Sequence, residues 1–224
     1  MADNAIPVLT IDGPSGSGKG TVAQRLAREL GWHYLDSGAI YRVFAQAALK
    51  RQLALTDMAA LTALAEQLDL RFDFVDETLT VWLDGEDVSV LIRSEQAGNA
   101  ASKVAAIPAV RAALLQRQRD FKQLPGLVTD GRDMGTVVFP EARFKVFLTA
   151  SAEERAKRRY KQLKQKGIES KLSDLIADIS ERDKRDKERD VAPLKAADNA
   201  LLIDSTALDI AAVCEQIRTF CSDI

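Results

Sequence analysis

Two glycines and a lysine near the start of the chain, Gly13-x-x-x-x-Gly18-Lys19, have the spacing of a phosphate-binding loop. Glycines allow the backbone angles that turn several N–H groups toward one point, where they can surround a polyanion. The lysine adds a full charge for the β- and γ-phosphates of a nucleoside triphosphate. We predict that this triphosphate is bound by the phosphate loop, defined as Gly13, Pro14, Ser15, Gly16, Ser17, Gly18, Lys19, Gly20 and Thr21.

The residues on either side fit such a loop. The apolar run at 8–11 is typical of a buried parallel strand, and apolar residues at every fourth position over 22–30 predict a helix from about Gly20. The positive end of this helix also faces the phosphates. Gly20 stands where such loops usually carry a magnesium-binding Ser or Thr, and Thr21 comes one place later. We therefore expect Mg²⁺ to be held by phosphates and water, and its direct protein ligands are unknown.

A second candidate site, Asp130-Gly-Arg132-Asp133-Met-Gly135, follows a predicted strand at 126–130. The carboxyl ends of parallel strands line the ligand crevice of an open sheet, so this turn should lie beside the phosphate loop. The forked guanidinium of Arg132 can bind a phosphate, and Asp133 can accept hydrogen bonds. An ordinary turn is the alternative, but an Arg-Asp pair in this place favours a functional role.

Ser37, Tyr41 and Arg42 stand where another predicted strand ends and a helix begins. A hydroxyl, an aromatic ring and an arginine are therefore expected at the same edge of the sheet. Ser37 could simply cap the helix, whereas Arg42, one turn further on, has no evident structural need.

Charged residues replace apolar ones on one face of a predicted helix in the last third of the chain. Arg182, Asp186 and Arg189 lie 7, 11 and 14 positions after Leu175 and share its face. Buried charge is costly without a partner, so this arrangement favours a cleft that holds a polyanion. A solvated run is the alternative, because every residue from 181 to 190 is charged.

Ser151-x-x-Glu154 is a helix-capping pattern, and the helix after it carries basic residues through Lys166. Nucleic-acid binding is one interpretation, but few aromatic residues are interleaved and the net charge is −2. A mobile lid over 154–170 that clamps phosphate explains the arginines better. Periodicity does not decide which of them points inward: Arg155, Arg158 or Arg159.

Five short apolar runs alternate with helical patterns and predict one parallel sheet covered on both faces. They are residues 8–11, 32–35, 126–130, 144–148 and 200–204. The interval of about 90 residues between the second and third runs is too long for one crossover. It holds a period-two pattern over 72–83 and then Asp84-Gly85, a hairpin signal. We expect an α/β core at 1–36 and 108–224 and an inserted α/β subdomain at 37–107.

Composition is that of an ordinary globular chain, because 46% of its 224 residues are hydrophobic. No apolar run approaches the roughly 18 residues of a membrane span, and no signal peptide is visible, so we expect a cytoplasmic location. Cys214 and Cys221 are seven apart on a helical pattern, about 10 Å, too far for a disulfide. The single histidine, His33, lies in a strand pattern and is expected to be structural.

At four places the residues resemble those of the bacterial cytidylate kinases, a branch of the nucleoside monophosphate kinases. The matching stretches are Asp12-Gly-Pro-Ser-Gly-Ser-Gly-Lys-Gly-Thr21, Asp36-Ser-Gly-Ala-Ile-Tyr-Arg42, Asp130-Gly-Arg-Asp-Met-Gly-Thr136 and Arg182-Asp-x-x-Arg-Asp…Val191-Ala-Pro-Leu194. Many monophosphate kinases share the first stretch, whereas the other three are more specific. The resemblance spans nearly the whole chain and implies a P-loop NTPase fold with a five-stranded parallel sheet, a monophosphate-binding insert and a short lid.

The same resemblance implies ATP-dependent phosphorylation of CMP and dCMP by a cytoplasmic monomer, with no nucleic-acid or membrane partner. The acceptor phosphate would be bound by Ser37, Arg42, Arg132 and Arg189. Cytosine would be recognised by Ser102, Arg111 and Asp133, and the sugar by Tyr41, Arg182 and Asp186. With Arg158 from the lid, the candidate catalytic residues are Lys19, Arg132, Arg158 and Arg189.

Three alternatives stay open. The chain could be a related kinase that acts on UMP, AMP or a small metabolite. It could be a nucleotide-binding switch, although no Asn-Lys-x-Asp guanine signature occurs. It could bind RNA through the basic helix, which the net charge disfavours.

Overall fold

The computed structural model describes residues 6–75, 78–165 and 167–222. The chain forms two compact units, Met1–Asp36 with Arg119–Ile224 (the core unit) and Ser37–Gln118 (the inserted unit). The insert was expected to end at residue 107. The inserted unit ends at Gln118 instead, because it includes nearly all of the helix α5 (Pro108–Arg119). Its inward residues Val110 and Leu114 are fully buried, which joins this helix to the interior of the inserted unit.

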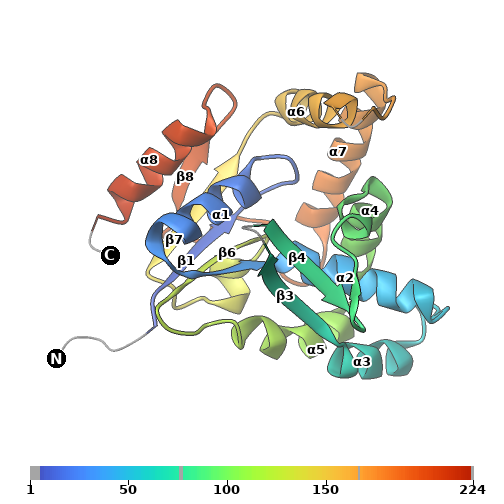
Figure 1. The fold of residues 1–224 in the computed structure, drawn as a ribbon. Coiled ribbons are helices and arrows are strands. Elements are labelled where there is room, and N and C mark those ends of the chain that lie inside the picture. Colours follow the sequence, from blue (N-terminus) through green and yellow to red (C-terminus); the bar gives the residue numbers. More distant parts are fainter. Residues whose placement is uncertain (1–5, 76–77, 166, 223–224) are drawn as a thin grey trace. The chain divides into compact units, whose positions relative to one another are not determined.

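The core unit is built on a parallel sheet with strand order β2-β6-β1-β7-β8 (Figure 1). The strands are β1 (Val8–Asp12), β2 (His33–Asp36), β6 (Leu127–Gly131), β7 (Phe144–Thr149) and β8 (Leu201–Asp204). Each of the five predicted strands is confirmed to within about two residues. Every residue of the central strand β1 is buried, as its continuous apolar run requires.

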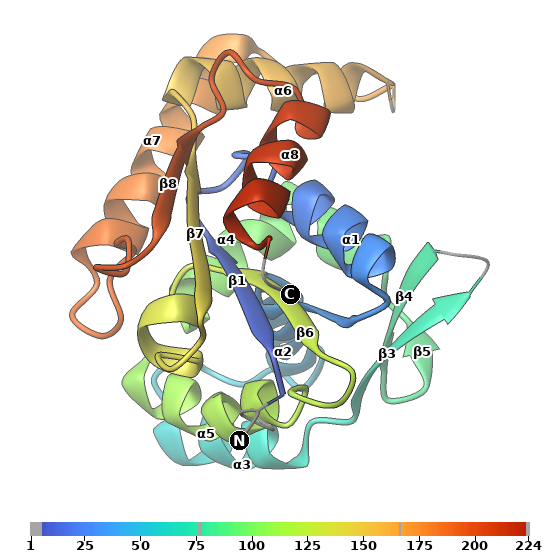
Figure 2. The ribbon, with the colours of Figure 1, turned by 90° about the vertical axis from the view of Figure 1, so that its left-hand side faces the viewer.

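The α-helices described in the core unit are α1 (Lys19–Leu30), α6 (Ala152–Gln165), α7 (Leu172–Glu188) and α8 (Ile210–Phe220). Figure 2 shows α1 and α8 side by side on one face of the sheet, and α6 packs against α7. The helix α1 starts one residue before the predicted position. A π-helical turn, η2 (Met134–Val138), follows β6 and was not expected from the sequence.

In the described part of the inserted unit, the α-helices are α2 (Ser37–Lys50), α3 (Met58–Gln67), α4 (Glu95–Val104) and α5. It also holds the 3₁₀ turn η1 (Leu91–Arg93) and a sheet of β3 (Leu70–Val75), β4 (Thr78–Leu83) and β5 (Glu86–Asp87). Asp84 and Gly85 both have positive φ, 51° and 80°, which is the predicted two-residue hairpin turn. The helix α4 was missed, because its buried stripe of Ala97, Ala101 and Val104 consists mostly of small residues, which give only a weak apolar signal.

The apolar spacing of Val110, Leu114 and Phe121, and of Leu172, Leu175, Ile176 and Ile179, predicts two helical core stripes, and one side chain of each lies elsewhere. Phe121 follows the end of α5, because the helix stops at Arg119. Leu172 is the first residue of α7 and is exposed, whereas Leu175 is buried beside Ala156 and Leu163 of α6.

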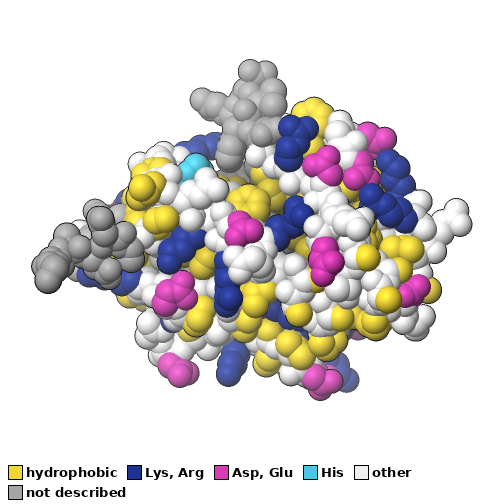
Figure 3. Space-filling view, turned by 90° about the horizontal axis from the view of Figure 1, so that it is seen from below, with side chains coloured by type: hydrophobic (Ala, Val, Ile, Leu, Met, Phe, Trp, Pro, Cys, Tyr) yellow, Lys and Arg dark blue, Asp and Glu magenta, His cyan; other side chains and the backbone are white. Residues whose placement is uncertain are grey.

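The two cysteines are free and buried in the C-terminal part of the core unit, as predicted. Burial raises the pKa of the Cys221 thiol to about 11 and also raises that of Cys214. Among the residues that the structure describes, no helix has both the length and the apolar composition of a membrane span. On the face seen in Figure 3, acidic and basic side chains are interspersed among apolar ones.

Candidate nucleotide site

The phosphate loop connects β1 to α1 and lies against β7. A Cβ atom on Gly13 would come within 2.0 Å of the Leu148 carbonyl oxygen, so no side chain fits there. Gly18 caps α1 in the left-handed region, with φ 93°. The loop therefore directs the N-terminus of α1 toward any bound anion, as the sequence predicts.

Lys19 is the first residue of α1 and only 8% exposed. Its Nζ donates a hydrogen bond to the Pro14 carbonyl oxygen at 3.1 Å. Burial lowers the pKa of Lys19 to about 7, and the positive charge of Arg132 acts in the same direction. A buried ammonium group beside another cation is electrostatically poised for a polyanion, which would relieve both penalties.

Arg132 follows directly after β6 and forms a buried ion pair with α7. Its Nε donates to Asp186 Oδ2 at 2.7 Å, and the two side chains are 16% and 6% exposed. Burial disfavours both charges, but their mutual attraction outweighs it. The pKa of Asp186 is therefore below its usual value, and that of Arg132 is above.

Asp133, next along the chain, is paired with the residue that ends α7. Arg189 Nη2 lies 3.7 Å from Asp133 Oδ1, an ion pair without a short hydrogen bond. Arg189 Nε also donates to the Ala192 carbonyl oxygen at 2.6 Å. Arg132 and Asp133, at the carboxyl end of β6, are thus each paired with an opposite charge from the C-terminal end of α7.

The charged face of α7 is turned inward at its C-terminal end. Asp186 is 4% exposed and the Arg189 side chain 6%, whereas Lys184, Lys187 and other residues of the run are exposed. The predicted inward orientation is therefore confirmed for Asp186 and Arg189, and a run that is solvated at every position is ruled out. Arg182 lies close enough to affect the pKa values of both Asp186 and Lys19.

Asp130, in β6, lies close to the start of α1. A Cβ on Gly20 would lie 3.8 Å from its Oδ1, and that oxygen accepts a 2.7 Å hydrogen bond from the Tyr34 hydroxyl. Burial, followed by the charge of Asp130, raises the pKa of Tyr34 well above its usual value. Within the described ranges, no three His, Cys, Asp or Glu residues gather as a metal site.

The remaining predicted substrate residues all belong to the inserted unit. Ser37 is buried at the start of α2 and donates to Gln118 Oε1 at 2.8 Å. The Arg111 guanidinium lies over the Tyr41 ring, 5.8 Å from its centroid, and also donates to a backbone carbonyl in the same unit. Both are buried, as is Ser102 of α4, while Arg42 of α2 is half-buried.

Of the three arginines of the predicted lid, Arg155 is bound to both the phosphate loop and α7. Its Nη1 donates to the Ser15 carbonyl oxygen at 3.0 Å and to Asp183 Oδ1 at 3.1 Å, and its Nε donates to Ala150. The Cβ and Cγ of Arg155 would lie 3.1 and 3.6 Å from a Cβ on Gly16. This arginine therefore ties α6 and α7 to the phosphate loop.

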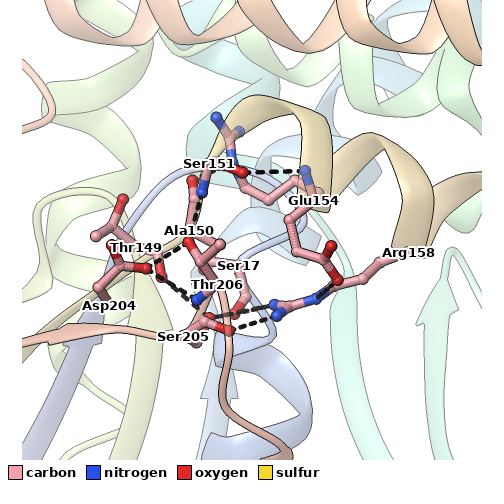
Figure 4. A network of polar contacts seen from close by, with 10 residues as sticks. Ser17, Thr149, Ala150, Ser151, Glu154, Arg158, Asp204, Ser205 and Thr206 are labelled. Atoms are coloured by element: carbon pink, nitrogen blue, oxygen red, sulfur yellow. Dashed lines mark hydrogen bonds and ion pairs between the residues drawn. The ribbon is translucent and has the colours of Figure 1, made fainter.

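Arg158 extends from α6 to the loop after β8 (Figure 4). It donates to the hydroxyl and carbonyl oxygens of Ser205 and, at 3.4 Å, to the Ser17 carbonyl oxygen. Glu154 pairs with Arg158 at 3.4 Å. The predicted capping box is therefore only half formed: the Ser151 hydroxyl accepts from the Glu154 N–H at 3.2 Å, while Thr206 accepts from the Ser151 N–H.

The first part of the predicted lid is thus anchored by Arg155 and Arg158. Arg159 donates to Gln162 Oε1 of the same helix at 3.3 Å. Lys166 of the lid lies outside the described residues. Sequence reasoning missed Asp12, Gln118, Asp183 and Ser205 as supports of the site. These residues lack a local signal, because their partners are 28 to 188 positions away along the chain.

Comparison with known proteins identifies the family. The family model described as cytidylate kinase matches residues 9–222. A cytidylate kinase of Aeromonas salmonicida is 62% identical over 204 residues, which cover 91% of this chain and 89% of the relative. One of Nitrosococcus oceani is 59% identical over 219 residues, covering 97% and 96%.

A solved structure, an uncharacterized protein from Eubacterium ventriosum, is similar in fold only. It is 12% identical with a TM-score of 0.50, and the match covers 97% of this chain and 99% of the other. A family match over nearly the whole length, together with the phosphate loop and the buried Arg-Asp turn, gives a single reading. The chain belongs to the cytidylate kinase family.

Proposed function

We propose that this protein transfers the γ-phosphoryl group of ATP to CMP or dCMP, giving CDP or dCDP and ADP. One observation carries the proposal beyond the family match: β1 and β6 are paired in parallel with Asp12 opposite Gly131. The phosphate loop and the Arg132-Asp133 turn therefore leave neighbouring strands at the same level. A triphosphate on one and an acceptor phosphate on the other would be adjacent.

The chemistry needs no general base. The nucleophile is an oxygen of the acceptor phosphate, already ionised near neutral pH because its second pKa is about 6. The protein has to align two anions in line and offset the charge that spreads over the transferred group. We assign that charge stabilisation to Lys19, Arg132 and Arg189.

In this proposal the acceptor phosphate replaces carboxylate partners of the site arginines. Arg132 is held by Asp186, and Arg189 by Asp133, in the absence of nucleotide. Ser37 and Arg42 of the inserted unit complete the phosphate contacts. The carboxylates keep the guanidinium groups oriented, so little rearrangement is needed when the phosphate binds.

Cytosine recognition is assigned to Asp133, Arg111 and Ser102. Cytosine presents an exocyclic amine where uracil presents a carbonyl, and a carboxylate accepts a hydrogen bond only from the amine. Arg111 supplies donors to the acceptor atoms of the base. The sugar is assigned to Tyr41, Arg182 and Asp186, and a single chain is proposed to carry both sites as a monomer.

We propose that a magnesium ion accompanies the nucleotide and is bound through phosphate oxygens and water, with Asp130 as a carboxylate close to the start of α1. When bound, it neutralises part of the phosphate charge. Of the predicted lid at 154–170, the part that follows the anchored Arg155 and Arg158 is proposed to close over the phosphates and exclude water.

A coupled assay of ADP release with CMP, dCMP, UMP and AMP tests the function. We expect turnover with CMP and dCMP at least about tenfold above UMP and AMP, since a site built around a hydrogen bond rejects analogues that lack the group. Equal rates on all four would reject cytosine specificity, and release without any acceptor dependence would favour a nucleotide-binding switch.

Asp133→Ala is a sharper test of base recognition. It should reduce kcat/KM for CMP more than for UMP, because only cytosine loses a hydrogen bond. An equal loss on both substrates would remove Asp133 from base recognition and leave the kinase activity standing.

A further inference from the structure

We propose that Asp12 is a positioning residue that holds the turn at residues 132–135 against β1 and so sets the direction of Arg132 and Asp133. The inference rests on the proposed function, because it concerns the acceptor side of the same site. Asp12 is the last residue of β1, directly before the phosphate loop.

The side chain of Asp12 binds two backbone N–H groups at once. Its Oδ1 accepts from the Met134 N–H and its Oδ2 from the Gly135 N–H, both at 2.8 Å. These are the first two residues of η2, whose N–H groups have no partner within the turn. A carboxylate uses one oxygen for each donor, which a carboxamide of the same shape cannot do.

Packing around Gly135 brings the turn close to β1. A Cβ on Gly135 would lie 2.8 Å from Thr10 Oγ1 and 3.3 Å from the Lys145 side chain, so no larger residue fits without movement. Thr10 and Asp12 are two apart on β1 and therefore point to the same face. The turn contacts β1 at both of these side chains.

Asp12 also fixes the residue that precedes the turn, through its backbone. Its backbone is paired with Gly131, the last residue of β6, and its side chain binds Met134 and Gly135. Only Arg132 and Asp133 lie between these two attachments. Since two residues bridge a short, doubly fixed gap, the directions of their side chains depend on Asp12.

Asp12 is buried, with 4% exposure, and burial raises its pKa to about 7 against the opposing effect of the two N–H bonds. Lys19 is near enough to act on it electrostatically. A role limited to the phosphate loop is therefore the competing explanation, and it predicts a loss of ATP affinity rather than of acceptor discrimination.

The test compares Asp12→Asn with wild type in three measurements: exchange of the Met134 and Gly135 amide protons, CMP-to-UMP preference in kcat/KM, and ATP affinity. We expect the two amides to exchange at least about tenfold faster, since one acceptor is lost. The preference should fall about tenfold, because small misplacements of binding groups are costly. ATP affinity should change less than about threefold.

Leu9→Ala is the matched control, because it removes buried apolar volume from the same strand on the face opposite to Thr10 and Asp12. It should lower the unfolding midpoint and leave the CMP-to-UMP preference unchanged. If Asp12→Asn does not fold, Gly135→Ala displaces the turn from Thr10 with Asp12 intact and should show the same loss of preference.

Loosened amides with an unchanged preference would overturn the inference, as would a loss confined to ATP affinity. A wild-type enzyme with no preference for CMP would instead reject the proposed function. Amide exchange would then still decide on its own whether Asp12 holds the turn.

Discussion

The arginines of the core unit fall into two groups with different partners. Arg155 and Arg158 on α6 donate to backbone carbonyls of the phosphate loop and of neighbouring loops, and Arg155 also pairs with Asp183. Arg132 and Arg189, at the ends of β6 and α7, pair with the carboxylates of Asp186 and Asp133, and their backbone acceptors, Gly131 and Ala192, lie outside the phosphate loop.

The difference teaches how one residue type serves two purposes. A carbonyl oxygen in a packed loop cannot leave, so an arginine bound to it is part of the scaffold. A carboxylate partner can be exchanged for a phosphate, which has the same charge sign and accepts the same forked hydrogen bonds. Contact with backbone carbonyls of the phosphate loop, which Arg155 and Arg158 make through Ser15 and Ser17, therefore separates the structural arginines from those proposed to bind substrate.

The largest effect is expected for the carboxylate-held group. Arg132→Lys and Arg189→Lys, made separately, keep the charge but lose the fork, and each should lower kcat by about 100-fold or more. Thermal unfolding should change little, since the buried carboxylates keep a cation. Turnover within about threefold of wild type, measured by coupled ADP release, would erase the distinction between the groups.

Loss of a backbone-held arginine should act on stability instead. Arg155→Ala leaves the Asp183 carboxylate, which is 14% exposed, without its main partner, and should cost about 3 kcal/mol in urea unfolding. Lys157→Ala, an exposed neighbour on α6, is the control and should cost under about 0.5 kcal/mol. An Arg155→Ala protein as stable as wild type would contradict the scaffold role.

Lys19 links the two groups, because it is buried in the loop that Arg155 supports and its pKa is lowered to about 7 by burial and then by Arg132. A bound triphosphate favours the charged form, so ATP binding should take up a proton above pH 7. ATP affinity should then fall about tenfold per pH unit between pH 8 and 9. Calorimetry in two buffers of different ionisation enthalpy measures this uptake.

The control for this pH effect is Lys19→Arg, whose guanidinium stays charged throughout and should bind ATP without proton uptake. Binding by the wild-type protein without net proton uptake in the same pH range would show that Lys19 is already charged before the nucleotide arrives.

The smallest effect on turnover is expected for Arg158. Its bonds to backbone carbonyls group it with Arg155, which disagrees with its candidate catalytic role. Arg158→Ala should raise the KM for ATP severalfold and lower kcat by less than about tenfold, since its described partners are Ser17, Ser205 and Glu154. A fall in kcat of about 100-fold at constant KM would restore Arg158 to the catalytic set.

Much of the core fold could be predicted from the sequence. Glycine spacing located the phosphate loop, and alternating apolar runs located the five strands, because backbone angle and burial act on neighbouring residues. The same reasoning found the turn at Asp84 and Gly85. It failed for α4, whose apolar stripe is made mostly of alanine, for η2, which is only five residues long, and for the end of the insert.

The sequence by itself determined which chemistry is present: a loop for phosphates, several arginines, and carboxylates at the ends of strands. Only the tertiary structure decided which arginine has which partner, and that Asp12 supports a turn more than 120 positions away. The physical reason is range. Local preferences are written in adjacent residues, whereas burial and pairing of charges depend on segments that meet only when the sheet is assembled.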